Sequence, residues 1–502
     1  MRYLIFTALA LVLLVGAASA LPNEVTATIV TTATGGDVYQ EAYNYVDDSG
    51  VEGAVVTETI EMVADATGEV TQDADNVAYV GGNGAVVTQS ISMDATGEDI
   101  WQNWWYGYGN YANVYGDEGT TTTQTFTQAA DAEDYVYQYA SNYVDPYAYS
   151  MSTQSIAQAA VAGGDVDQYG YNEAYFYGDG SAAIQSVSMD ANAGGYADQY
   201  GYNYADMYGD DGWMSTMVDQ SATLNAIAGD VVYQYFYNDI PYATGGSVND
   251  QAITMSGTAG TDVYQYLYNY IDLWNAVSED NQVLSAAAFA ADGYVYQDAY
   301  NEIDYGTDVG ITRGNEIASQ SISLGGVASD EVYQYGWNWA DLDDNAVLGQ
   351  LVSIGGDGSY VDQEAYNDAY FGYSATIAQA LEFSAISDDE GVDQYGYNYA
   401  TNPWDDGGAT SAIGQSISAA ATGGDISYQE FYNTAALDWN WAPGTYNVVQ
   451  SNVATLAATD EAYQGMYNWV YWWDPNTGSV AMDILGDASA DYVYQYHENW
   501  IG

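Results

Sequence analysis

The chain has 502 residues, of which 70 are acidic and only two are Lys or Arg, so its formal net charge at pH 7 is −68. Nucleic acid and anionic membrane surfaces are excluded as partners, because both are bound through Lys and Arg. Ion pairs cannot stabilise the fold for the same reason, and the lack of cysteine excludes disulfides. Since 48% of the residues are hydrophobic and 15% aromatic, the chain has enough apolar surface to fold despite its charge.

The first twenty residues have the features of a secretory signal peptide. Arg2 supplies the positive start, Leu4 to Val15 is an apolar run, and Ala18-Ser19-Ala20 is a small-residue cleavage site. The apolar run is shorter than a membrane span, and no second candidate follows it. We therefore expect an exported protein whose mature chain begins at Leu21 and contains no membrane span.

A glutamine followed four residues later by an asparagine recurs about every 32 residues from residue 40 onward. Gln102 fills the one irregular place, with a longer stretch to Asn110. A fixed period of this length is typical of stacked repeat proteins, so residues 21–502 are expected to be one continuous array of about fifteen repeats. The regular pairs are Gln40 with Asn44, Gln72 with Asn76, Gln138 with Asn142, Gln168 with Asn172, Gln199 with Asn203, Gln234 with Asn238, Gln265 with Asn269, Gln297 with Asn301, Gln334 with Asn338, Gln363 with Asn367, Gln394 with Asn398, Gln429 with Asn433, Gln464 with Asn468 and Gln495 with Asn499.

Each repeat contains two segments with the period-two alternation of β-strands. In residues 198–206 the amides, a glycine and an alanine fall on one face, and three tyrosines fall on the other. The first segment carries its own glutamine, usually fourteen residues earlier, such as Gln185 before Gln199. Turns rich in Gly and Asp, such as residues 163–165, join the two segments.

This pattern predicts an all-β protein, a β-solenoid or β-arch array of strand–turn–strand repeats with the amides inside. A lone buried amide is costly, but identical amides stacked at ~4.8 Å can hydrogen-bond along the stack. Small residues such as Gly170, Gly201, Gly396, Ala42 and Ala365 would let the two strands of a repeat approach closely. The alternative is a long antiparallel hairpin array in which Gln and Asn merely occupy a polar face.

The Gln-Tyr-Gly-Tyr-Asn-Tyr-Ala form at residues 199–205 and 394–400 resembles the repeats of curlin-type functional amyloid subunits, although curlin repeats are shorter. The whole mature chain, which is exported, free of cysteine, acidic and rich in tyrosine, resembles the major sheath proteins of filamentous methanogenic archaea. This resemblance implies assembly into a tubular, amyloid-like cell sheath.

The sequence contains few residues that could act in catalysis. The chain has no Cys or Lys and one His, so a serine nucleophile would lack a base. His497 stands where other repeats carry a small or apolar residue, and Arg313 is the only cation of the expected mature chain. We therefore expect no enzymatic activity.

The acidic residues suggest a cation site. Aspartates recur at the turns, three or four residues before the glutamine, and further pairs occur in the loops. Stacking would bring these carboxylates within ~5 Å of each other, and Ca²⁺ or Mg²⁺ would relieve their repulsion. The alternative is a solvated acidic surface. The candidate ligands are Asp37, Asp99, Asp165, Asp210, Asp211, Asp262, Asp343, Asp344, Asp405, Asp406 and Asp425.

Together these features predict a secreted structural protein that assembles with copies of itself into an extracellular sheath or fibre. The alternative is a monomeric, calcium-loaded solenoid that acts as an adhesin or surface-binding module.

Overall fold

The structure is a computed structural model, and nearly all of what it describes is β-strand. No helix occurs among the described residues, and none of them therefore forms a helix that could cross a membrane. The all-β prediction is confirmed. The described residues are 7–15, 24–48, 53–103, 109–115, 119–146, 149–177, 180–208, 216–244, 246–274, 278–306, 316–342, 345–372, 374–402, 410–437, 445–472 and 477–501.

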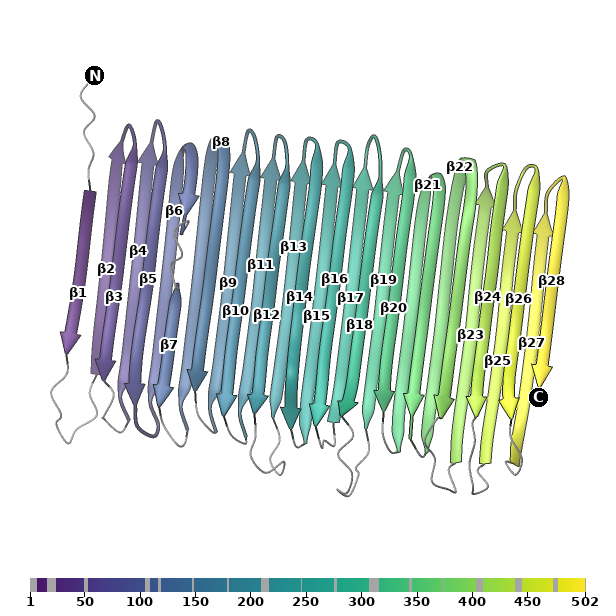
Figure 1. Ribbon diagram of the computed structural model, residues 1–502. Coiled ribbons are helices and arrows are strands. Elements are labelled where there is room, and N and C mark those ends of the chain that lie inside the picture. Colours follow the sequence, from purple (N-terminus) through teal and green to yellow (C-terminus); the bar gives the residue numbers. More distant parts are fainter. Residues whose placement is uncertain are drawn as a thin grey trace. The chain divides into compact units, whose positions relative to one another are not determined.

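The chain divides into two units, residues 1–250 and 251–502, with the boundary inside β15 (Ser247–Ala259). Figure 1 shows the strands of each unit lying side by side. The first unit contains β1 (Thr7–Val15), β2 (Glu24–Gly35), β3 (Val38–Asp48), β4 (Val55–Ala66), β5 (Val70–Gly81), β6 (Val86–Gln102), β7 (Asn110–Tyr115), β8 (Thr121–Pro146), β9 (Met151–Ala162), β10 (Val166–Tyr177), β11 (Ala182–Ala193), β12 (Ala197–Tyr208), β13 (Met217–Ala228) and β14 (Val231–Thr244). The second unit contains β16 (Asp262–Trp274), β17 (Ser278–Ala290), β18 (Val295–Gly306), β19 (Ile317–Ala328), β20 (Glu331–Leu342), β21 (Ala346–Phe371), β22 (Ala375–Asn402), β23 (Thr410–Gly423), β24 (Ile426–Leu437), β25 (Thr445–Ala457), β26 (Glu461–Trp472), β27 (Thr477–Ser489) and β28 (Tyr492–Ile501).

The strands form a parallel β-solenoid with repeats of about 31 residues. All the described strand pairs are parallel, and a strand typically pairs with the strand two places further along the chain, as β10 does with β12. The antiparallel hairpin alternative is therefore wrong. In each unit the first segments of the repeats form one sheet, here called sheet 1, and the second segments form another, sheet 2. The long strands β6, β8, β21 and β22 contribute one half to each sheet.

Sheet register is fixed by the repeat, because like residues lie opposite one another. Gln168, Asn172 and Ala174 of β10 face Gln199, Asn203 and Ala205 of β12. The irregular repeat also keeps this register: β5 pairs with the end of β6 up to Gln102, and then with β7 from Asn110 onward. A one-residue slip would turn the amides and aliphatics outward, so the buried face enforces the alignment.

The core lies between sheets 1 and 2 of each unit. Valine and isoleucine from both sheets fill it, together with the amides, and most of these side chains are fully buried. The small residues have the predicted function of allowing close packing. A Cβ at Gly201 would lie 2.2 Å from the ring of Phe236 in the next coil, and one at Gly170 would lie 2.7 Å from the Met189 methyl of sheet 1.

The apolar run at the N-terminus contributes strand β1, which pairs in parallel with β3. In this register Ala8 lies opposite Gln40 and Val12 lies opposite Asn44. With residues 7–15 present, β1 therefore occupies the edge of β3.

Candidate functional site: amide ladders, turns and the tyrosine face

The glutamines of sheet 2 form a continuous hydrogen-bonded column in each unit. In every step the Nε2 of one glutamine donates to the Oε1 of the glutamine in the preceding coil, at 2.7–2.9 Å. The first unit's column runs from Gln40 to Gln234, and the second unit's from Gln265 to Gln495. All the sheet 2 glutamines predicted for the ladder are in these columns.

The asparagines of sheet 2 form a second column in each unit, and its hydrogen bonds run the opposite way. Here the Nδ2 of each asparagine donates to the Oδ1 of the asparagine in the following coil, at 2.9–3.0 Å. Asn110 takes its place between Asn76 and Asn142. The Gln and Asn columns of one sheet therefore point in opposite directions along the stack.

All the asparagines predicted for the ladder lie in these columns, and each makes at least one of the bonds just described. Those of the first unit are Asn44, Asn172, Asn203 and Asn238. Those of the second unit are Asn269, Asn338, Asn398, Asn433 and Asn468. The structure differs from the prediction in one respect, because Asn44 Oδ1, at the start of the first column, is buried without a partner.

A second hydrogen bond fixes the orientation of the amides. Asn172 Nδ2 donates to the backbone oxygen of Ser186 in sheet 1 at 3.0 Å, and Gln168 Nε2 donates to that of Asp190 at 3.2 Å. Turning either amide over would place its oxygen against a carbonyl oxygen. These bonds also join the two sheets, so buried amides that would be costly alone are largely satisfied.

The glutamines of sheet 1 form a third column in each unit, from Gln89 to Gln220 in the first and from Gln251 to Gln450 in the second. Gln185 donates to Gln154 at 2.8 Å, and its Nε2 also lies 2.8 Å from the backbone oxygen of Tyr204. At the N-terminal end the column stops at Glu58, which accepts from Gln89 at 2.7 Å and lies opposite Ala27. At the C-terminal end it stops at Gln450, which lies opposite Met482.

Glu58 is a charged residue in an otherwise neutral column. Its side chain is fully buried, and its Oε1 has no hydrogen-bond partner. Burial raises the pKa of Glu58 from 4.5 to about 7, and the hydrogen bond from Gln89 offsets this in part. The sequence signal for this residue was available, because a glutamate stands where other first segments have glutamine, but its isolation in the core required the structure.

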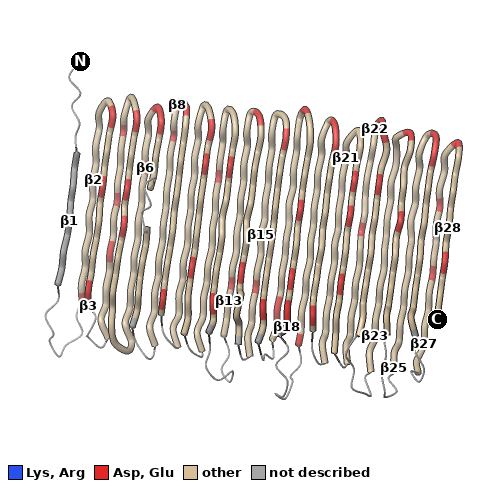
Figure 2. The backbone as a smooth tube through the Cα atoms, in the orientation of Figure 1, with Lys and Arg blue, Asp and Glu red and all other residues tan. Residues whose placement is uncertain are grey.

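The turn aspartates bind backbone N–H groups of the next coil. Asp165 Oδ1 accepts from the Tyr196 N–H at 2.8 Å, and Asp262 Oδ1 accepts from the Tyr294 N–H at 2.9 Å. Asp37 accepts from the Glu69 N–H at 3.3 Å, and Asp425 accepts from the Thr459 hydroxyl at 3.1 Å. Figure 2 shows acidic residues at most of the short turns. These carboxylates therefore connect successive turns.

No group of three metal-ligating side chains occurs among the residues that the structure describes. Asp99 lies at the sheet edge of the turn, opposite Tyr135. The predicted loop ligands Asp210, Asp211, Asp343, Asp344, Asp405 and Asp406 lie outside the described residues, as does Arg313.

The outer face of sheet 2 carries columns of aromatic rings and is here called the tyrosine face. In the first unit six rings, from Tyr45 to Tyr204, follow one another at centroid distances of 4.9–5.8 Å. In the second unit eight rings, from Tyr268 to Tyr496, do so at 4.5–6.3 Å. The prediction that the amides point inward and the tyrosines outward is correct.

Carboxylates on the tyrosine face are hydrogen-bonded by aromatic side chains of neighbouring coils. Tyr202 donates to Asp239 at 2.9 Å, Tyr360 to Asp393 at 2.6 Å, and the Trp337 indole to Asp368 at 3.0 Å. Burial raises the pKa of Asp368 to about 6, although the Trp337 bond lowers it. Burial, with the neighbouring Glu364 and Asp393, raises the pKa of Asp362 to about 6. Without cations, phenols and indoles are the groups that stabilise these carboxylates.

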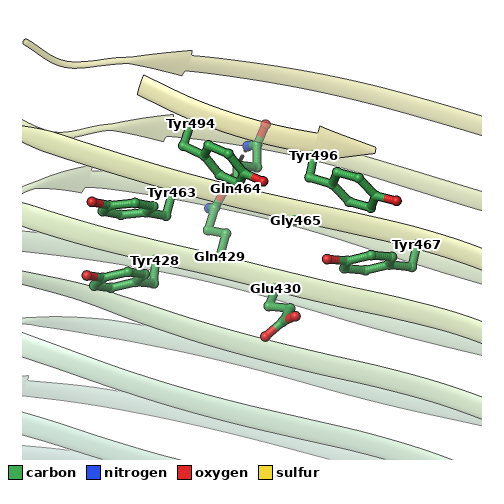
Figure 3. Close-up of a pocket in the computed structure, with 9 residues that line it drawn as sticks. All are labelled: Tyr428, Gln429, Glu430, Tyr463, Gln464, Gly465, Tyr467, Tyr494 and Tyr496. Atoms are coloured by element: carbon green, nitrogen blue, oxygen red, sulfur yellow. Dashed lines mark hydrogen bonds between the residues drawn. The ribbon is translucent and has the colours of Figure 1, made fainter. Parts of the chain in front are cut away.

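One groove of about 390 Å³ opens on the tyrosine face beside Gly465. Figure 3 shows the stacked rings of Tyr428 and Tyr463 on one side of it and Tyr467 on the other. The Tyr428 and Tyr463 rings are 4.7 Å apart and nearly parallel. The carboxylate of Glu430 lies at the groove and accepts a hydrogen bond from Tyr432. An aromatic groove with an acid would suit a cationic group.

No protein-family description, curated protein or solved structure matches this chain.

Proposed function

We propose that this chain is a secreted structural protein that assembles with copies of itself into an extracellular sheath or fibre. The observation that carries the proposal is that the Gln and Asn columns of sheet 2 reach β28, where Gln495 and Asn499 bond to no further strand among the described residues. An open parallel edge with unused amides is a template for another strand. The resemblance to archaeal sheath proteins supports the extracellular location.

The chemistry of the described residues favours a structural role over catalysis. His497 lies in the last strand opposite Met466, and burial lowers its pKa. No other histidine exists in the chain, and the buried polar groups are mostly used in ladders. We infer that the protein has no enzymatic activity.

Assembly of such an acidic chain requires its charge to be reduced. Mg²⁺ or Ca²⁺ would do so by screening or by binding the loop carboxylates, and mild acid would do so by protonating carboxylates whose pKa is raised. We propose that either treatment promotes assembly of residues 21–502. Sedimentation velocity with and without divalent cations at pH 7.5, and at pH 5, measures this. A chain that stays monomeric under all these conditions contradicts the proposal.

One observation favours the alternative of a monomeric adhesin. The sheet 1 column is closed by Ala27 and Met482 in the terminal coils, as expected of a capped solenoid. That function predicts a monomer with stoichiometric Ca²⁺, whereas the polymer predicts fibre diffraction with a strong reflection near ~4.8 Å along the long axis.

A further inference from the structure

The C-terminal coil, β27 and β28, presents amide groups that its own chain does not use. Gln495 Nε2 donates to Gln464 at 2.8 Å, and Asn499 Oδ1 accepts from Asn468 at 2.9 Å. Among the described residues, Gln495 Oε1 accepts no hydrogen bond and Asn499 Nδ2 donates none. This end therefore offers an acceptor in the Gln column and a donor in the Asn column.

The N-terminal coil, β2 and β3, presents the opposite set. Asn44 donates to Asn76 at 3.0 Å, but its own Oδ1 is buried and has no partner. Gln40 Nε2 is directed away from Gln72; it donates to the Thr31 hydroxyl at 3.1 Å and to the Val63 backbone oxygen at 3.2 Å. Thr31 thus occupies the place that a preceding glutamine fills elsewhere. This end offers an unpaired acceptor in the Asn column and, once Gln40 exchanges its bond to Thr31, a donor in the Gln column.

We propose that mature chains join head to tail, with β27 and β28 of one copy paired in parallel with β2 and β3 of the next. Asn499 donates to Asn44 of the next copy, and Gln40 of the next copy donates to Gln495. Both columns then continue across the junction with unchanged direction. This inference rests on the proposed function, because it specifies the partner and the contact of the polymer.

The lengths of the two terminal coils match this register. Gln40 lies thirteen positions after Ala27, and Gln495 lies thirteen positions after Met482. Ala27 and Met482 are also the residues that stand opposite the ends of the sheet 1 column. When Gln495 lies opposite Gln40, Met482 therefore lies opposite Ala27, and both pairs of strands stack without a shift.

In the same register the acidic residues of the two coils do not face one another. The acids of one strand fall opposite hydroxyl groups of the other, so no two of these carboxylates face each other. Within the chain, tyrosines also bind carboxylates of the neighbouring coil, although at diagonal positions, as Tyr202 does with Asp239 and Tyr360 with Asp393. The matched pairs, with the N-terminal residue belonging to the next copy, are Tyr496 with Glu41, Glu498 with Tyr43, Asp483 with Thr28 and Asp487 with Thr32.

Strand β1 occupies the same edge in the chain that retains residues 7–15. It pairs along β3 and places Ala8 and Val12 opposite Gln40 and Asn44. Neither residue is Gln or Asn, so β1 does not extend the sequence of amides. Removal of residues 1–20 would expose the edge that the junction needs, and the full chain should polymerise more slowly than residues 21–502.

The test uses two variants of residues 21–502. Each variant changes the outward-facing hydrogen-bonding groups at one end of the chain only. In Gln495→Lys with Asn499→Asp, the bonds to Gln464 and Asn468 remain possible, but the outer donor and acceptor are exchanged. In Gln40→Glu, the bond from Gln72 remains possible, but the outer donor is lost. Control variants carry the same charge changes on the outer face of sheet 1: Ser451→Lys with Ser416→Asp, and Thr88→Glu. Circular dichroism establishes that all are folded.

At pH 8 with Mg²⁺, we expect each end variant alone to sediment as a monomer and their equimolar mixture to form 1:1 dimers. The controls should polymerise as the wild type does. Homodimers of either variant, or no dimer in the mixture, would show that the junction is wrong while the proposed function stands. A wild-type chain that never polymerises would overturn both.

A second measurement does not depend on amide polarity. Glu41→Cys and Tyr496→Cys should form a disulfide with each other when the two chains are mixed and oxidised, because the two positions are opposite in the junction. Each variant alone should form little disulfide. Predominant homodimeric disulfides would indicate ends that meet like to like, and would contradict the head-to-tail junction.

Discussion

The inner and outer faces of sheet 2 are built on the same strands but follow different rules. Inside, each column repeats one amide in every coil and joins its members by hydrogen bonds of one direction. Outside, the aromatic columns accept Tyr, Trp, Asp, Glu or Gly at equivalent places, as Tyr335, Glu364, Tyr395 and Glu430 show. The difference indicates that repetition is required only where water is excluded, because no water can replace the bond that a buried amide loses with its neighbour.

The comparison is tested most strongly by removing one inner amide. Gln199→Leu would leave Gln168 Oε1 and Gln234 Nε2 without their 2.8 Å partners, at a cost of about 3–5 kcal/mol for two buried polar groups. Tyr200→Leu, one residue further on the outer face, should cost about 1 kcal/mol through lost ring contacts. Urea unfolding measures both. Equal losses would show that inner and outer columns do not differ.

The buried carboxyl group of Glu58 provides a second test of the inner face, through the dependence of stability on pH. Since burial raises its pKa from 4.5 to about 7, the folded state binds the proton more tightly than the unfolded state. Stability should therefore fall as pH rises from 4.5 to 7, and the full cost, about 3 kcal/mol, applies above pH 7. Glu58→Gln should recover this stability at pH 8 and change little at pH 4.

The matched control for Glu58 is Glu61→Gln on the same strand, where the side chain is exposed. Thermal unfolding between pH 4 and pH 8 compares the two variants. A similar pH dependence in wild type and in Glu58→Gln would contradict the assignment. The pKa values of Asp362 and Asp368 are raised from 3.8 to about 6 and act with the same sign, so the wild type should also lose stability between about pH 4 and pH 6.

Close packing gives a smaller expected effect. Gly201→Ala would place a methyl group 2.2 Å from the Phe236 ring, and the ring would have to move, at about 2 kcal/mol. Gly349→Ala faces open space on the outside of sheet 1 and should be neutral or slightly stabilising. Urea midpoints distinguish the two. A neutral Gly201→Ala would mean that the Phe236 ring of the next coil moves aside without cost.

The turn carboxylates should give the smallest effect. Asp165→Ala removes the acceptor of the Tyr196 N–H bond at an exposed site, at a cost of about 1 kcal/mol. Asp165→Asn keeps an acceptor oxygen and should retain most of that stability. If Asp165→Asn instead lost stability only in the presence of Ca²⁺, the carboxylate would be a metal ligand and the backbone role would be secondary.

Much of the fold followed from the chain alone. Period-two alternation gave two strands per repeat, and the common face of Gln, Asn and Val indicated the core. The register of Gln102 with Asn110 was also correct, since an insertion between them does not disturb the columns. Alternation does not by itself distinguish parallel from antiparallel pairing, because both place the same residues on the inner face; the solenoid was predicted from the stacking of like amides, and it is confirmed.

The candidate site divides in the same way. The ladder residues were identified from spacing, whereas the turn aspartates were expected to meet cations, and Asp165 and Asp262 instead bind the N–H groups of the next turn. A sequence shows that acids are repeated near the bend. It does not show which backbone N–H group each carboxylate reaches, because that depends on how the turns stack.

What the sequence determined by itself is therefore the composition, the repeat period and the face on which each side chain lies: an acidic chain of strand–turn–strand repeats with amides inside and tyrosines outside. Local geometry determines which face each side chain occupies, because side chains alternate along a β-strand whichever strand it pairs with. Only the tertiary structure decided the parallel pairing, the opposite directions of the Gln and Asn columns, and the unpaired Asn44 oxygen. These depend on hydrogen bonds between residues about 31 positions apart, which exist only when the coils are stacked.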